Sequence, residues 1–179
     1  MADLLPEKWM KGIAITTTIL AVVAAIGSSR SSFFVARAQL LTALEGSQWG
    51  YYQAKSIKSY IYEMRAENFE IQVASLMKEK GNEQLISEYN GKIDEYKKNV
   101  KKYEDEKTVI SKTAIDFQNE RDECKKHSAK FGIGVIFLQI SILLSSIATL
   151  SKKKFVWICG LVLGVIGIFY FIDGFFMFL

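Results

Sequence analysis

Three apolar runs, each long enough to cross a lipid bilayer, constrain this chain more than any other feature. They are residues 12–27, residues 131–150 and residues 155–179. A helix needs about 17 to 25 residues to cross the hydrocarbon core, and the first run reaches that length with its flanking Ser28 and Ser29. The sequence therefore predicts three transmembrane helices, the last two forming a membrane hairpin. A secretory signal peptide is the alternative for the first run, but its spanning length favours an uncleaved helix.

Most of the charged residues lie between these runs, so we expect three parts: residues 1–29, residues 30–130 outside the membrane, and residues 131–179. The net charge of +4 is small, and basic and acidic residues of the central part nearly balance. No basic surface of the kind that binds nucleic acid is predicted. Two cysteines, Cys124 and Cys159, are too few for a disulfide framework.

The distribution of lysine predicts the orientation. Three spans place the N-terminus and residues 152–154 on one face of the membrane and the central part on the other. Lys8, Lys11 and the three lysines at 152–154 favour the cytoplasm for their face. Basic residues that flank the spans on the other face oppose this assignment: Arg30, Arg37, Lys125, Lys126 and Lys130. Because the central part exceeds the length of about 60 residues within which loop charge counts, we expect it outside the cytoplasm.

The second half of the central part carries a heptad repeat, with apolar residues alternately three and four apart. This seam consists of Ile86, Tyr89, Ile93, Tyr96, Val100, Tyr103, Ile110, Phe117 and Cys124. A period of 3.5 predicts a left-handed supercoil with a partner helix. Phe131 continues the seam into the second span, so we expect one helix to pass from water into lipid.

The partner helix is predicted to be the first half of the central part, with the turn near residues 81–82. Gly and Asn favour a turn there, and Asn90-Gly91 is a rival that would interrupt the seam. In the first half, an apolar stripe of four residues is expected to face the seam, and larger residues widen it towards the tip: Ile57, Ile61, Met64, Ile71, Phe69, Val73, Leu76 and Met77. The fold class predicted is all-α, with an antiparallel coiled-coil hairpin between the first and second spans.

Two features of the first half leave its path open. Gly46 and Gly50 flank Trp49, which predicts a kink or a short break in the helix. Residues 33–44 could lie along the membrane surface as an amphipathic helix or rise into the hairpin.

Two blocks of sequence resemble a known family. Residues 48–58 read QWGYYQAKSIK, and residues 131–148 read FGIGVIFLQISILLSSIA before a Lys-rich turn; the opening Glu7-Lys8-Trp9 is similar too. They resemble the bacterial membrane-protein family called domain of unknown function 4337. The resemblance implies a bacterial inner-membrane protein, so the expected place of the central part outside the cytoplasm is the periplasm. It supplies no activity, so no catalytic residue is carried over.

Candidate chemistry is sparse. Cys124 and His127 lie three residues apart and could share a metal ion, but two ligands are too few, and Cys124 fits the seam as a small buried side chain. No phosphate-binding loop, nucleophile motif or carboxylate pair with a histidine base is present. We therefore expect no enzyme activity, no cofactor and no metal site.

Small residues predict close helix contacts in the spans. Gly160, Gly164 and Gly167 share one face of the third span, and Ser141 and Ser145 share a face of the second. These faces could pack within one subunit or between subunits. Asp173, the one ionisable residue in an apolar run, would be an ion site at mid-bilayer, but its place near the end of the run favours the membrane interface.

These expectations combine into a non-enzymatic inner-membrane protein that forms a homo-oligomeric coiled-coil scaffold or a partner-binding stalk. Its expected partners are membrane lipid, further copies of itself and another protein bound through the hairpin, with no nucleic acid. The alternative is a component of a transport or channel assembly. In that case Gln139, Ser141 and Ser145 are the polar residues available to line a pathway.

Overall fold

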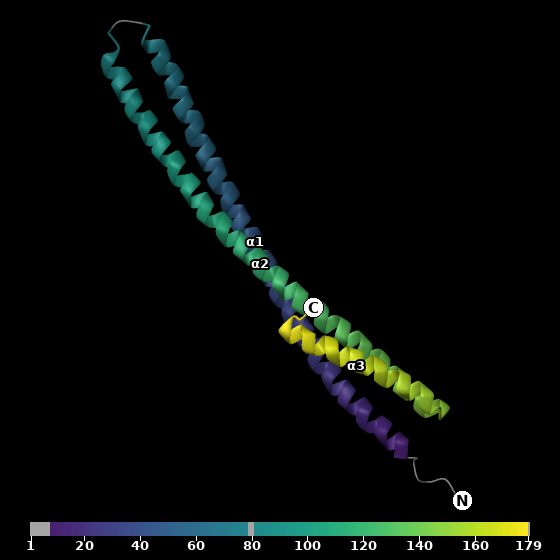
Figure 1. Ribbon diagram of the computed structural model, residues 1–179. Coiled ribbons are helices and arrows are strands. Elements are labelled where there is room, and N and C mark those ends of the chain that lie inside the picture. Colours follow the sequence, from purple (N-terminus) through teal and green to yellow (C-terminus); the bar gives the residue numbers. More distant parts are fainter. Residues whose placement is uncertain (1–7, 79–80, 179) are drawn as a thin grey trace, which may run out of the picture. The chain divides into compact units, whose positions relative to one another are not determined.

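Three long helices make up the described residues of the computed structural model, which are residues 8–78 and 81–178 (Figure 1). They are α1 (Lys8–Leu76), α2 (Glu83–Ser151) and α3 (Lys154–Phe176). No strand occurs in this part of the chain, so the predicted all-α class with three long helices is confirmed. Each helix contains a stretch that is long and apolar enough to cross a membrane. The last residue of the predicted third span, Leu179, lies outside the described residues.

The chain divides into two compact units by its internal contacts. Leu41–Asn119 form one unit, which we call the arm, and Met1–Leu40 with Glu120–Leu179 form the other, which we call the apolar unit. The predicted boundaries at residues 30 and 130 follow the ends of the apolar runs. The division by contacts falls ten residues later in α1 and ten residues earlier in α2, because residues such as His127 contact the C-terminal end of α3.

The connection between α1 and α2 lies between Leu76 and Glu83, with residues 79 and 80 outside the described part. Gly81 has a φ of 103°, a conformation that glycine adopts without the steric cost of a Cβ atom. Asn90 and Gly91, the rival turn, lie within α2. The short break expected between Gly46 and Gly50 does not occur, since α1 is helical throughout this region.

In the arm, α1 and α2 run antiparallel and are joined by interleaved aromatic rings. The Tyr62 ring contacts Tyr103 and Tyr96 at centroid distances of 5.7 and 5.8 Å. Phe69 then contacts Tyr96 at 5.8 Å and Tyr89 at 5.0 Å. These five residues form an aromatic ladder, and each aromatic pair contributes about 0.5 to 1.5 kcal/mol beyond its buried area.

The predicted contact face of α1 is only partly right: Phe69 contacts α2 and Val73 is buried, but the main stripe is wrong. Ile57, Ile61, Met64 and Ile71 were expected to face α2, but their side chains are 42 to 69% exposed. The residues that alternate with the ladder on the buried face are smaller than isoleucine: Ser59, Ala66 and Val73, each 4 to 7% exposed. Their smaller volume leaves room for the aromatic rings, whereas longer side chains at those positions would hold the helices apart.

In the apolar unit, α3 packs on α2 through glycines that bring the two backbones together. A Cβ atom added to Gly167 would lie 3.0 Å from the Gly134 carbonyl oxygen and 2.8 Å from Leu138 Cγ. A Cβ atom on Gly164 would lie 2.9 Å from Ser141 Oγ. Because real Cβ contacts of this length are essentially never seen, these positions require glycine for the helices to approach as they do.

The same contact has a polar component. Ser141 Oγ donates a hydrogen bond to the Gly160 carbonyl oxygen at 2.6 Å, and Ser145 Oγ donates to the Ser141 carbonyl oxygen at 2.9 Å. Both serines are fully buried. Leu138 fills the adjoining core with Leu20 and Ala24 of α1, so all three helices meet around this layer.

We expect Gly167→Ala to lower the free energy of unfolding by about 1 to 3 kcal/mol, because the new methyl group meets backbone atoms that cannot turn aside. Thermal melting of the full-length protein in detergent, followed by circular dichroism, measures the change. Gly91→Ala is the matched control: nothing lies within 4 Å of its added Cβ atom, and it should stabilise the exposed helix by about 0.5 to 1 kcal/mol. Equal melting temperatures for the two variants would contradict the close contact.

Candidate functional site

Next to the aromatic ladder, polar side chains of α1 and α2 form ion pairs and hydrogen bonds with one another. Lys55 Nζ of α1 lies 2.5 Å from Glu106 Oε2 of α2. Ser59 Oγ donates to Glu104 Oε1 at 2.8 Å, and Lys107 Nζ contacts the same oxygen at 2.7 Å. Each carboxylate of this cluster is therefore held by a cation, and one of them also by a hydroxyl group.

These contacts favour the ionised carboxylates. The hydrogen bonds from Lys107 and Ser59 lower the pKa of Glu104 below its ordinary value. The hydrogen bond from Lys55 does the same for the pKa of Glu106 and raises the pKa of Lys55. Because Lys55 and Ser59 of α1 bond the ionised carboxylates of α2, the cluster serves as an electrostatic contact between the two helices.

The stability of the arm should fall in acid. The lowered pKa values mean that the cluster's stabilisation is complete above the ordinary carboxyl value of 4.5 and is lost as pH falls through the folded-state pKa values. We expect the melting temperature of the full-length protein to decrease steadily from pH 5 to pH 3. The double variant Glu104→Gln/Glu106→Gln should melt lower at pH 7 and show a weaker decrease. A decrease as steep as that of the unmodified protein would exclude these two carboxylates as its source.

Every residue of the predicted α2 seam is buried or half-buried in the structure: Ile86, Tyr89, Ile93, Tyr96, Val100, Tyr103, Ile110, Phe117 and Cys124. Cys124 belongs to the apolar unit and the others to the arm. All five residues of the predicted packing faces are buried as well: Gly160, Gly164, Gly167, Ser141 and Ser145. The glycine face, which could have served packing within or between subunits, contacts α1 and α2 of the same chain.

A buried ion pair lies at the end of α3. Asp173 is 1% exposed, and its Oδ2 atom lies 2.8 Å from Lys130 Nζ of α2. Its Oδ1 atom accepts a hydrogen bond from the Phe178 backbone N–H at 2.6 Å, just beyond the last turn of the helix. The lysine contact balances the charge of the carboxylate, so Asp173 joins α3 to α2 and is not an isolated acid.

His127 makes a second link to the same end of α3. Its Nδ1 atom lies 2.7 Å from the Gly174 carbonyl oxygen, so Nδ1 carries the hydrogen and donates it. The ring stacks on Phe34 of α1 at a centroid distance of 4.8 Å. These contacts occupy one ring nitrogen and one ring face, and within the described residues no three His, Cys, Asp or Glu side chains are grouped to hold a metal ion.

We expect Asp173→Asn to destabilise the protein by about 3 to 5 kcal/mol, because it leaves the Lys130 charge beside a buried position without its carboxylate. The double variant Lys130→Met/Asp173→Asn should recover part of that loss, since the charge requiring compensation is then gone. Melting of the four proteins of this cycle in detergent gives the coupling between the residues. Simple addition of the two single effects would mean that the pair does not stabilise the fold.

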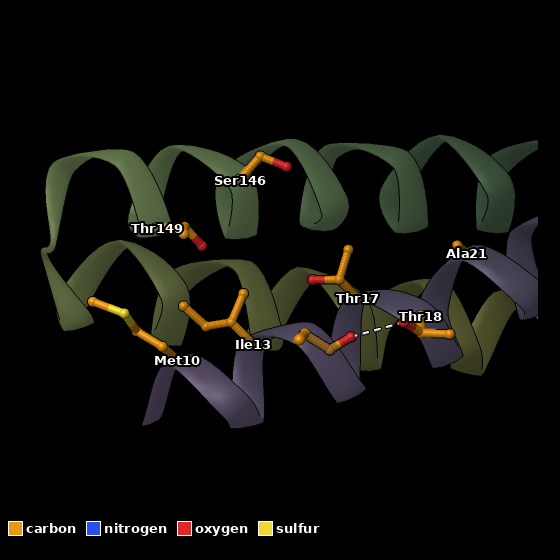
Figure 2. Close-up of a pocket in the computed structure, with 8 residues that line it drawn as sticks. Met10, Ile13, Thr17, Thr18, Ala21, Ser146 and Thr149 are labelled. Atoms are coloured by element: carbon orange, nitrogen blue, oxygen red, sulfur yellow. Dashed lines mark hydrogen bonds between the residues drawn. The ribbon is translucent and has the colours of Figure 1, made fainter. Parts of the chain in front are cut away.

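An open groove of about 500 Å³ lies between α1 and α2 in the apolar unit (Figure 2). It is lined by Met10, Ile13, Ala14, Thr17, Thr18, Ala21, Ser146 and Thr149. Thr18 Oγ1 donates to the Ala14 carbonyl oxygen at 2.8 Å, and Ser146 and Thr149 likewise bond carbonyl groups of their own helix. Thr17 Oγ1 is buried and has no hydrogen-bond partner among the described residues. The groove thus combines an apolar floor with a few hydroxyl groups.

The sequence pattern did not identify the ion pair or the groove. Lys130 stands at the edge of an apolar run, where lysine is ordinary, and Asp173 was assigned to the interface without a partner. Their separation by a whole helical hairpin left no local spacing to connect them. The small residues Ala14, Thr17 and Ala21 line the groove from α1, but only the positions of α2 and α3 show which part of α1 stays uncovered.

Comparison with curated proteins and with solved structures finds no significant match. One family model matches almost the whole described chain, from residue 9 to residue 177, and covers both units. Its description assigns no reaction, ligand or partner. The chain therefore belongs to the family described as "Domain of unknown function (DUF4337)".

Proposed function

We propose that this chain is a non-enzymatic integral protein of the bacterial inner membrane, in which the apolar unit is the anchor and the arm is a homo-oligomeric scaffold or a stalk for a protein partner. The observation that carries the proposal is the contrast between the two units. One presents apolar helices of spanning length, and the other presents two charged helices whose polar groups bond each other across their contact.

The polar groups of the apolar unit support membrane anchoring. The 23 residues of α3 extend about 35 Å at 1.5 Å per residue, which matches a hydrocarbon core of about 30 Å. Trp157 Nε1 contacts Thr16 Oγ1 at 3.4 Å near the start of α3, and tryptophan favours the membrane interface. The Asp173–Lys130 pair lies near the other end of α3, where a buried charge pair is close to water.

The arm supports a structural role more than a catalytic one. Its α2 segment, residues 83–119, extends about 55 Å at 1.5 Å per residue. Along that length the side chains between the helices form the aromatic ladder and the Glu104 and Glu106 contacts. A long pair of helices of this kind offers extended faces to a partner.

The groove of Figure 2 favours a second candidate, a component of a transport or channel assembly. In such an assembly the hydroxyl groups of Thr17, Ser146 and Thr149 would line part of a pathway completed by other subunits. Ser141 and Ser145 do not suit that role, since both are buried against α3 or bonded within α2. Gln139 is exposed on α2 and stays available.

Labelling of single cysteines tests the anchor and its orientation. In a background with Cys124→Ala and Cys159→Ala, Asn82→Cys reports the tip of the arm and Lys153→Cys reports the connection between α2 and α3. A thiol reagent that passes the outer membrane but not the inner membrane should label position 82 in intact cells. Position 153 should react only after the inner membrane is opened, because three spans put the two sites on opposite faces.

The opposite labelling pattern would place the arm in the cytoplasm and reverse the orientation. Labelling of both positions in intact cells, or recovery of the protein in the soluble fraction, would exclude three spans. A carbonate wash of the membranes, which removes proteins bound only at the surface, distinguishes insertion from peripheral binding.

A further inference from the structure

In the arm, α1 carries a second heptad row that α2 leaves uncovered. Its positions again alternate three and four apart, all are exposed, and none is charged. We call this the outer row: Ala43, Ser47, Gly50, Ala54, Ile57, Ile61, Met64, Asn68, Ile71 and Ser75. At 3.5 residues per turn, the outer row lies about 150° around α1 from the row that contains Ser59, Tyr62, Ala66 and Phe69.

The outer row holds large apolar side chains on a part of the chain that is otherwise strongly charged. Ile57 and Ile71 are 61 and 69% exposed. Most of the exposed large apolar residues in the arm belong to α1, whereas α2 contributes only Leu85, Val109 and Ile115 among the described residues. An apolar surface of this kind on a unit outside the membrane marks an interaction site.

We propose that the outer row is the contact with the outer row of α1 in a second copy of this chain, with the two α1 helices parallel and in register. The proposal deepens the scaffold function and rests on it, because copies anchored in one membrane on the same side extend their arms in the same direction. The resulting contact joins two hairpins through their α1 helices and leaves α2 on the outside of each.

The shape of the row identifies a helix as its occupant. A period of 3.5 maintained from Ala43 to Ser75 covers about 48 Å, and a partner that follows it must be a helix of similar length with the same period. The α1 helix of a second copy meets both conditions. Small residues occupy the N-terminal end of the row, where two backbones can therefore approach closely: Ala43, Ser47, Gly50 and Ala54.

Asn68 points to a copy of the same chain. It occupies an a position of the outer row, with Ile57, Met64 and Ile71 at d positions. A single asparagine at an a position of a parallel pair hydrogen-bonds its equivalent across the interface and sets the register. Against an unrelated apolar helix, the same side chain would lose its contact with water without a partner.

The flanking charges agree with the parallel arrangement. Each g position of one helix then faces the following e position of the other. The facing pairs are Gln53 with Lys58, Tyr60 with Arg65, and Glu67 with Gln72. No like charges meet, and the tyrosine ring faces a guanidinium group that it can attract. An antiparallel pair would instead set e positions against each other and bring Lys58 and Arg65 of the two copies together.

Oxidative cross-linking in native membranes tests the contact. Single cysteines are placed at four outer-row positions, Ile57→Cys, Ile61→Cys, Met64→Cys and Asn68→Cys, in the Cys124→Ala/Cys159→Ala background. Glu63→Cys is the control, because Glu63 is exposed on α1 but lies off the row. We expect a disulfide-linked dimer at the row positions at least tenfold more abundant than at position 63.

A second variant checks that apolar contact holds the pair. Met64→Glu added to Ile57→Cys should reduce the linked dimer at least tenfold, while helicity stays unchanged because the Met64 side chain is exposed on α1. Equal linking at positions 57 and 63, or no linking anywhere, would overturn the proposal. So would a linked product whose mass differs from a dimer, or linking between Ile57→Cys and Ile71→Cys chains when the two are co-expressed, which a parallel pair in register does not allow.

Fractionation of the same cells separates this proposal from the anchor on which it rests. Protein that stays in the membrane without linking removes the parallel pair and leaves the anchor intact. Linked dimer in the soluble fraction would support the parallel pair and contradict the membrane anchor.

Discussion

The fit of small α1 residues between large α2 rings is the interaction on which the arm depends. Ser59, Ala66 and Val73 are buried on the same face of α1 from which Tyr62 and Phe69 contact the rings of Tyr89, Tyr96 and Tyr103. Packing of this kind fixes both the register and the face of each helix. With this face taken up by the aromatic contacts, Ile57 and Ile71 of the outer row stay exposed.

The apolar unit uses a different means to the same end. Lipid tails are as apolar as the side chains of a neighbouring helix, so hydrophobicity alone does not drive helices together in a membrane. Helix contact there relies on close backbone approach and on hydrogen bonds. Gly134 and Gly167 supply the approach, and Ser141 supplies a bond to Gly160. The Asp173–Lys130 pair and the His127 bond to Gly174 then tie the end of α3 to α2. The ionisable side chains of Asp173, Lys130 and His127 thus serve to hold the helices together.

Residue spacing predicted the contact face of α2, but it did not show which of two rows on α1 would meet that face. The heptad in α2 predicted which side of that helix would be covered, because α2 has one apolar row of period 3.5. In α1 two rows share that period, and the row with more isoleucine was the wrong one. Hydrophobicity alone favoured the outer row, whereas packing against tyrosines required the smaller side chains.

The sequence by itself determined the apolar stretches of the helices and the turn near Gly81, since these follow from local composition and from backbone preferences at single positions. Only the tertiary structure decided which row of α1 meets α2, which glycines touch a backbone, and that Lys130 pairs with Asp173. These features depend on the volume and charge of residues far apart in the chain. Spacing within one helix reports its own faces and carries no information about the side chains that will lie opposite.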